Sequence, residues 1–126
     1  MKIDLLLKFS VNREIEEKFL KMDVFHFLLE NEEVELAYTH MRDKVWFTNK
    51  RIITMDVQGL SGKKTEFRFF AYSKITSFSI ETSGSFDGDC DFKIWVSGVG
   101  MFQIKFDKKL DIRKVGKLMS KHTLDD

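Results

Sequence analysis

Acidic residues alternate at positions 87–91 in the pattern that is closest to a metal-binding loop. Asp87, Asp89 and Asp91 occur as D-G-D-C-D, the spacing with which a calcium loop begins. Such a loop continues with glycine and closes with glutamate at its twelfth position, where this sequence has Phe92 and Gly98. Asp89 and Asp91 also fall on the outer face of a predicted strand. The sequence therefore predicts no metal site and no cofactor.

Cys90 is the one cysteine of the chain. It is in phase with Phe92 and Ile94, which predicts a small buried residue rather than an exposed nucleophile beside a base. The sequence contains no G-x-S-x-G motif, and the glycines at 59 and 62 are followed by a strand pattern instead of the helix that a phosphate-binding loop needs. The histidines have no paired spacing for zinc: His26, His40 and His122. We predict that the protein is not an enzyme.

Composition and charge restrict the partners. The chain has 126 residues with 21 Lys and Arg against 20 Asp and Glu, a net charge of +1, whereas duplex nucleic acid needs a concentrated basic face. We therefore predict no nucleic-acid partner. No apolar run reaches the roughly 18 residues of a membrane span, and the apolar N-terminal run is interrupted by Asp4 and Lys8. A single cysteine fits a reducing compartment, so we expect a cytoplasmic protein. The length of 126 residues predicts one domain over residues 1–126.

Seven strands are predicted between residues 33 and 106, organised around Val45–Phe67. That stretch contains two β-prone runs, the polar break Asn49-Lys50 and a glycine-containing turn. The full set of predicted strands is 33–41, 45–48, 51–57, 63–72, 75–82, 90–97 and 102–106. Ile75 is out of phase with Phe78 and Ile80, which predicts a bulge or a bend near Ser77. Short turns between all seven predict antiparallel neighbours.

Helices are predicted at both ends of this β region. Residues 11–29 have helical spacing at Ile15, Phe19 and Met22, within a helical N-terminal extension over 1–29. Residues 108–122 form a closing helix that Asp107 caps, with a lysine-rich outer face. The predicted fold is thus mainly β with helices (α+β): a seven-stranded antiparallel barrel or sandwich capped by the C-terminal helix.

Several short motifs carry a resemblance to a known family. They are L-L-E-N-E-E-V at 28–34, F-T-N-K-R-I-I at 47–53, D-x-Q-G-x-x-G-K-K at 56–64, Y-S-K-I at 72–75, E-T at 81–82 and F-D at 86–87. With them the sequence resembles the bacterial pleckstrin-homology-like domain family, whose fold is the pleckstrin-homology (PH) superfold. The resemblance implies a small domain with a helical N-terminal extension, self-association into symmetric rings and an unassigned biochemical role.

The PH resemblance also makes lipid binding the alternative function. In eukaryotic members of the superfold, basic residues near the first strand-to-strand loop hold phosphoinositide head groups. The candidate contacts for an anionic lipid surface are Arg42, Lys44, Lys50, Arg51, Lys63 and Lys64. Asp43 offsets the two cations of the first loop, and lysines at turns usually serve solubility.

Four aromatic residues are candidate contacts between subunits. Trp46 and Trp95 are out of phase with the apolar positions beside them in their strands. Phe69 and Phe70 are adjacent, so a flat strand must turn one of them outward. Either the N-terminal helix covers these rings or another subunit does. The resemblance favours another subunit, in a closed ring. We therefore expect a non-enzymatic interaction or scaffold domain whose partner is itself and possibly another protein.

Overall fold

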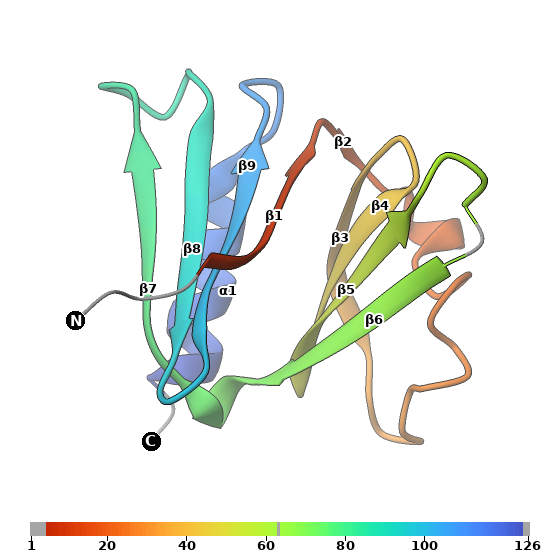
Figure 1. Cartoon of the computed structure of the whole chain (residues 1–126). Coiled ribbons are helices and arrows are strands. Elements are labelled where there is room, and N and C mark those ends of the chain that lie inside the picture. Colours follow the sequence, from red (N-terminus) through yellow and green to blue (C-terminus); the bar gives the residue numbers. More distant parts are fainter. Residues whose placement is uncertain (1–4, 63, 125–126) are drawn as a thin grey trace.

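The chain forms two β-sheets and a C-terminal helix in the computed structural model, which describes residues 5–62 and 64–124 (Figure 1). Sheet A contains, in spatial order, β1 (Leu5–Val11), β9 (Gly100–Phe106), β8 (Cys90–Val96) and β7 (Ile75–Thr82). Sheet B contains β2 (Arg13–Glu14), β3 (Val34–His40), β4 (Asp43–Thr48), β5 (Arg51–Gln58) and β6 (Lys64–Ala71). The helical elements are the 3₁₀ turns η1 (Glu17–Phe19) and η2 (Tyr72–Lys74) and the helix α1 (Ile112–Thr123).

All seven strands predicted between residues 33 and 106 are present, but the count of seven is wrong. Two further strands, β1 and β2, precede them. In the described part of the chain no ladder joins the two sheets, so the strands form a sandwich and not a closed barrel. The predicted irregularity near Ser77 is confirmed, because the register between β7 and β8 shifts between Ile75 and Ser77.

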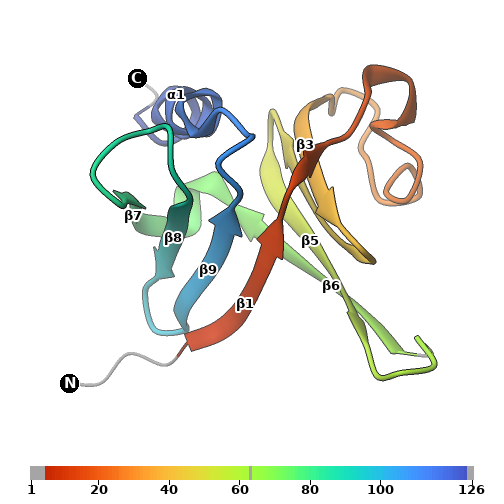
Figure 2. The same ribbon diagram turned by 90° about the horizontal axis from the view of Figure 1, so that it is seen from above.

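The prediction of a helical N-terminal extension is wrong. Residues 5–11 form β1, which runs parallel to β9 at the edge of sheet A, with Phe9 opposite Ile104. Leu7, Phe9 and Val11 are buried while Lys8 is exposed, so Lys8 is the outward position of an alternating strand and not a break in an apolar run. From β1 the chain passes directly into sheet B, as Figure 2 shows.

Residues 12–29 differ from the predicted helix because the sheet takes their backbone hydrogen bonds. The N–H of Asn12 donates to the carbonyl of Thr39 (3.1 Å), and that of Ile15 donates to Ala37 (2.9 Å), which extends the edge of sheet B. After η1 the segment continues through turns. Apolar side chains on both sides of η1 pack against the outer face of sheet B: Ile15, Leu20, Val24 and Leu28. Residues 12–29, which we call the covering segment, therefore cover this face, although they do not form an α-helix.

Aromatic rings and aliphatic side chains fill the space between the sheets, and this core contains many of the phenylalanines of the chain. Tyr38 and Phe106 meet edge-on at 5.0 Å between centroids, and Phe70 and Phe102 at 4.5 Å. Such edge-to-face pairs add to the free energy of burying the rings.

Helix α1 closes one opening of the sandwich (Figure 2). It buries four apolar side chains and contacts both sheets: Ile112, Val115, Leu118 and Met119 face the core. Its cap is Asp111, whose side chain accepts a hydrogen bond from the N–H of Arg113 (3.1 Å). The prediction of Asp107 as the cap was wrong, because Asp107 instead forms a turn of its own with Lys109 and Leu110.

Candidate functional site

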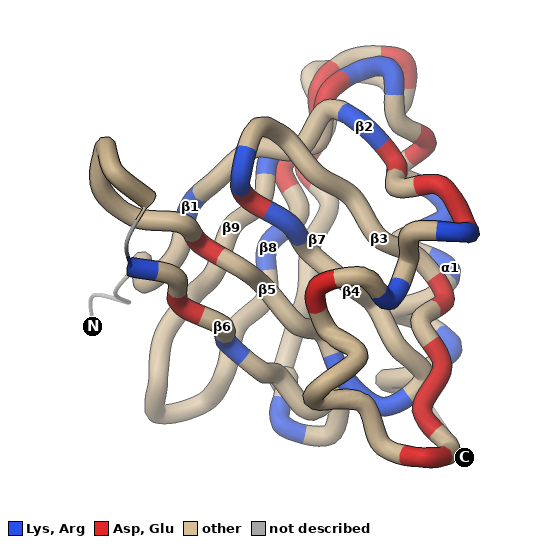
Figure 3. The backbone as a smooth tube through the Cα atoms, turned by 90° about the vertical axis from the view of Figure 1, so that its right-hand side faces the viewer, with Lys and Arg blue, Asp and Glu red and all other residues tan. Residues whose placement is uncertain are grey.

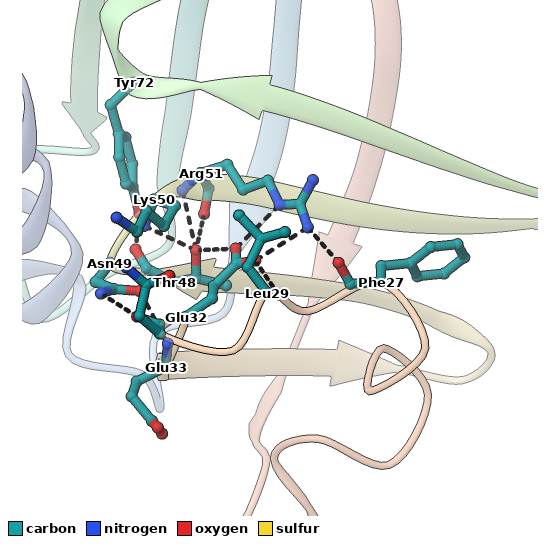
Figure 4. Close-up of polar contacts among 10 residues, drawn as sticks. Phe27, Leu29, Glu32, Glu33, Thr48, Asn49, Lys50, Arg51 and Tyr72 are labelled. Carbon is teal, nitrogen blue, oxygen red and sulfur yellow. Dashed lines mark hydrogen bonds and ion pairs between the residues drawn. The ribbon is translucent and has the colours of Figure 1, made fainter.

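A buried carboxylate fixes the segment that precedes β3. Glu32 is 2% exposed, and its oxygens accept hydrogen bonds from Thr48 Oγ1 (2.7 Å) and from the backbone N–H of Leu29 (3.1 Å). Arg51 donates to the same carboxylate from Nε and from Nη2, both at 3.0 Å (Figure 4). Arg51 Nη2 also donates to the carbonyl of Phe27 at 2.6 Å, so one guanidinium holds both ends of the loop.

The electrostatic balance at Glu32 favours the ionised form. Burial raises the pKa of this carboxyl, but the hydrogen bonds from Arg51, Thr48 and Leu29 outweigh burial and lower the pKa overall. Sequence reasoning did not identify Glu32, which stands in a run of glutamates that looks solvent-exposed. The sequence signal that could have identified Glu32 is Arg51, which directly follows the β4–β5 turn and donates to its carboxylate.

Two of the motifs that carry the family resemblance are joined at this point. Besides the Glu32–Arg51 pair, Asn49 Oδ1 accepts a hydrogen bond from the N–H of Glu33 (2.8 Å). Asn49 Nδ2 donates to the carbonyl of Asn31 (3.2 Å). Motif residues 28–34 and 47–53 therefore form one polar clamp between the covering segment and sheet B (Figure 4). Within the clamp these side chains bond to each other and to the backbone of residues 27–33, so their role is to hold the backbone.

Above this clamp the protein exposes a group of large apolar side chains, which we call the apolar surface. Its members are Phe19, Met22, Phe25, Phe27, Leu29 and Phe69. Phe27 lies against Phe69 of β6 with ring centroids 5.2 Å apart, and against Phe67 at 5.0 Å, so the covering segment and the strand contribute to one surface. Met22, Phe25 and Leu29 are 57–60% exposed. A helix would have placed Phe27 on a different face from Phe25 and Leu29.

The four predicted aromatic contacts have different positions. Trp46 is 0% exposed and packs with Val24 of the covering segment, so cover within the chain accounts for this ring. Phe70 is 8% exposed and belongs to the core between the sheets. Trp95 is partly buried on β8. Phe69 is 42% exposed and belongs to the apolar surface.

Five of the six predicted lipid-contacting cations are described; they lie at two opposite ends of sheet B, and three of them are engaged within the chain. Arg42 Nη2 donates to the carbonyl of Gly59 (3.0 Å), Lys44 pairs with Asp23, and Arg51 pairs with Glu32. Lys50 and Lys64 are exposed, and Lys63 lies outside the described residues. On the side of the molecule in Figure 3, basic and acidic residues are interleaved along the chain instead of gathering in one basic patch.

The hydrogen bond from Arg42 brings two hairpin tips together. The β3–β4 turn carries Met41, which is 84% exposed, and the β5–β6 turn carries Leu60, which is 104% exposed. Gly62 in the second turn has φ +67°, and a Cβ there would stand 2.6 Å from Arg42 Nη1. The two hairpin tips, connected by the hydrogen bond from Arg42 to Gly59, thus expose the apolar side chains of Met41 and Leu60.

The residues singled out for chemistry are separated or buried. Cys90 is 3% exposed, and burial raises the pKa of its thiol, with the negative charges of Asp89 and Asp91 adding to that effect. Asp89 accepts a hydrogen bond from the N–H of Lys108 (2.9 Å). Among residues 5–62 and 64–124, no three His, Cys, Asp or Glu side chains are grouped so that they could hold a metal ion. His122 lies 2.7 Å from Glu35, whereas His40 ends β3 and His26 lies against the ring of Phe25.

None of the helices in the described segments is both long and apolar enough to cross a lipid bilayer.

Two packed sheets with a helix over one opening define a PH-like fold, and comparisons with known proteins agree. The chain belongs to the bacterial PH domain family, whose model matches residues 6–123. A crystal structure of a DUF1696 family protein with a pleckstrin-homology domain from Shewanella loihica superposes with a TM-score of 0.79 at 34% identity, covering 87% of this chain and 95% of that one. A pleckstrin homology domain from Shewanella amazonensis gives a TM-score of 0.69 at 33% identity, covering 86% and 89%.

Two proteins of Bacillus subtilis strain 168 are similar in sequence. The uncharacterized protein YjqA is 47% identical over 98 residues, which cover 74% of this chain and 78% of YjqA. The uncharacterized protein YozO is 35% identical over 114 residues, covering 90% and 95%. The family resemblance inferred from the motifs is therefore confirmed, and the similarity to uncharacterized relatives leaves the role to be inferred from the surface of the protein.

Proposed function

We propose that this protein is a non-enzymatic interaction domain that self-associates through the apolar surface into a homo-oligomer. The observation that carries the proposal is the exposure of several large apolar side chains on one segment, because isolated PH-sized domains rarely present contiguous apolar surface without a partner. The aromatic and methionine content of this surface matches the residue types enriched at the centre of protein interfaces.

Hydrogen bonds fix part of the segment that carries the apolar surface, which favours an interface over a mobile loop. The clamp of Glu32, Asn49 and Arg51 fixes the backbone of residues 27–33 on sheet B. The Arg51 guanidinium also lies 5.2 Å from the ring centroid of Phe69, which orients that ring. An interface assembled on pre-ordered side chains loses less conformational entropy on association.

Light scattering coupled to size exclusion tests this proposal at micromolar concentration. We expect a mass that is a multiple of 14.9 kDa for the natural chain and a monomer for a Phe25→Ser, Leu29→Ser variant. Both positions are more than half exposed, so the fold is expected to persist. The matched control replaces two exposed apolar residues elsewhere, Leu60→Ser and Val99→Ser, and is expected to keep the oligomer. A monomeric natural chain contradicts the proposal.

The alternative function is peripheral binding to an anionic membrane through the joined hairpin tips. The observation that favours it is the pairing of Met41 and Leu60, both almost fully exposed, beside Arg42 and Lys64. Cosedimentation with anionic vesicles over a salt series measures it, because electrostatic adhesion weakens with salt. A Met41→Asp, Leu60→Asp variant is expected to lose the binding. Absence of binding at low salt, with an intact oligomer, eliminates this alternative and leaves the first proposal standing.

A further inference from the structure

A pocket of about 350 Å³ lies where three distant segments meet at the end of sheet B opposite the hairpin tips. The β4–β5 turn contributes Asn49 and Lys50, the connection from β6 to β7 contributes Ala71, Tyr72 and Ser73, and the last turn of α1 contributes Lys121 and His122. Neither the lysine nor the histidine of α1 was among the predicted site residues.

The walls of this pocket are held by hydrogen bonds and ring stacking. Thr48 Oγ1 accepts from the N–H groups of Lys50 and Arg51, both at 2.9 Å, which fixes the turn. The buried hydroxyl of Tyr72 donates to the carbonyl of Thr48 (2.6 Å). The ring of His122 stacks on that of Tyr72, with centroids 4.7 Å apart and an interplanar angle of 12°. The three segments are therefore locked together before any ligand arrives.

The charged side chains that line the pocket are basic, and one carboxylate, that of Glu35, lies against two of them. Lys50 forms no ion pair within the described part of the chain, and its side chain is exposed at the turn. Lys121 Nζ is 3.6 Å from Glu35 Oε2, while Glu35 Oε1 is occupied by His122 at 2.7 Å. Glu35 is thus the one carboxylate that the described residues place against Lys121, and it is shared with His122. Ser73 adds a hydroxyl that can donate a hydrogen bond.

We propose that this pocket binds a phosphate group between Lys50 and Lys121, with the Ser73 hydroxyl as a further donor. Two ammonium groups match a phosphate dianion, and lysines bind phosphate as point charges. The volume exceeds that of a phosphate alone, so the pocket has room for part of the organic group that carries it. The site does not use the apolar surface or the hairpin tips, so it stands apart from both proposed functions.

Titration of the labelled full chain with sodium phosphate, followed by ¹H–¹⁵N NMR at constant ionic strength and neutral pH, tests the proposal. We expect saturable shifts of the Lys50, Ser73 and Lys121 amides, and an apparent affinity at least tenfold weaker in a Lys50→Gln, Lys121→Gln variant. A Lys108→Gln, Lys109→Gln variant loses the same charge from an exposed loop and is expected to bind like the natural chain. Shifts that do not saturate, or an equal effect in both variants, overturn the proposal.

Vesicles distinguish the two sources of a phosphate group. If the natural chain and the Lys108, Lys109 variant sediment with phosphatidylglycerol vesicles but not with phosphatidylcholine, and the Lys50, Lys121 variant does not sediment, the phosphate belongs to a lipid headgroup. If phosphate binds saturably and no vesicle is bound, the site takes a soluble phosphorylated molecule. Either result supports the site and names its source.

Discussion

The Arg51 guanidinium and the Glu32 carboxylate form a pair joined by two hydrogen bonds, with both N–O distances at 3.0 Å. The Glu32 carboxylate is almost completely excluded from solvent. The same guanidinium reaches the carbonyl of Phe27. The backbone of residues 27–32, which carries Phe27 and Leu29, is therefore attached to sheet B in part through this ion pair, so the stability of the pair and the proposed interface are linked.

Removing the carboxylate is expected to destabilise the protein. Glu32→Ala removes the carboxylate that accepts from both Arg51 and Thr48, and we expect a loss of about 2 kcal/mol in the free energy of unfolding. This value is below the usual cost for a fully buried pair, because the Arg51 side chain is 25% exposed and therefore partly screened. Urea unfolding measures the loss. The exposed pair of Arg68 and Glu66 is the control, and Glu66→Ala is expected to cost less than about 1 kcal/mol. Equal losses for the two variants would show that the clamp adds nothing.

The stability that Glu32 contributes is expected to depend on pH. Its pKa in the folded protein is lowered from the ordinary value of 4.5, so the contribution is fully present above about 4.5 and is lost as pH falls through the lower folded value. The difference in unfolding free energy between the natural chain and a Glu32→Gln variant should therefore shrink as the solution is acidified below that value. Urea midpoints of both proteins over an acidic pH series measure it. A difference that stays constant across the series contradicts the lowered pKa.

The strands from residue 34 onward were predictable for two reasons. β8 and β9 alternate between buried and less buried positions. β4 and β5 are buried on consecutive positions, but they are runs of β-branched and aromatic residues bounded by short turns. The N-terminal region was not predictable, since Leu5, Leu6 and Leu7 are consecutive and hide the alternation that continues through Phe9 and Val11. Helical spacing at Ile15, Phe19 and Met22 was misleading, because an adjacent sheet edge offered backbone partners that a local pattern does not reveal.

Less of the candidate site was predictable than of the fold. Exposure of Phe69 follows from its strand position, but burial of Trp46 depends on the segment that covers it from a distance in the sequence. The pocket at Lys50 and Lys121 joins residues about seventy positions apart, and only the docking of α1 against η2 brings them together.

Two neighbouring leucines allow a test of β1, the strand that was not predicted from the sequence. Leu7 is 6% exposed and faces the core, while its neighbour Leu6 is 37% exposed and faces outward. We expect Leu7→Ala to lower the free energy of unfolding by about 3 kcal/mol and Leu6→Ala by less than about 1 kcal/mol. Urea denaturation of the two variants measures the difference. Similar losses at both positions would contradict an alternating strand at the edge of sheet A.

The thiol of Cys90 is expected to react slowly in the folded protein. It is buried at the start of β8, and burial, followed by the charges of Asp89 and Asp91, raises its pKa and reduces the thiolate fraction. Reaction with a chromogenic disulfide at neutral pH should be on the order of a hundredfold slower in the native protein than in concentrated guanidinium chloride, because modification requires local opening of sheet A. Because the chain has one cysteine, Cys90→Ser removes the whole signal and serves as the blank. Equal native and denatured rates would show that the thiol is accessible and would reopen its candidacy as a nucleophile.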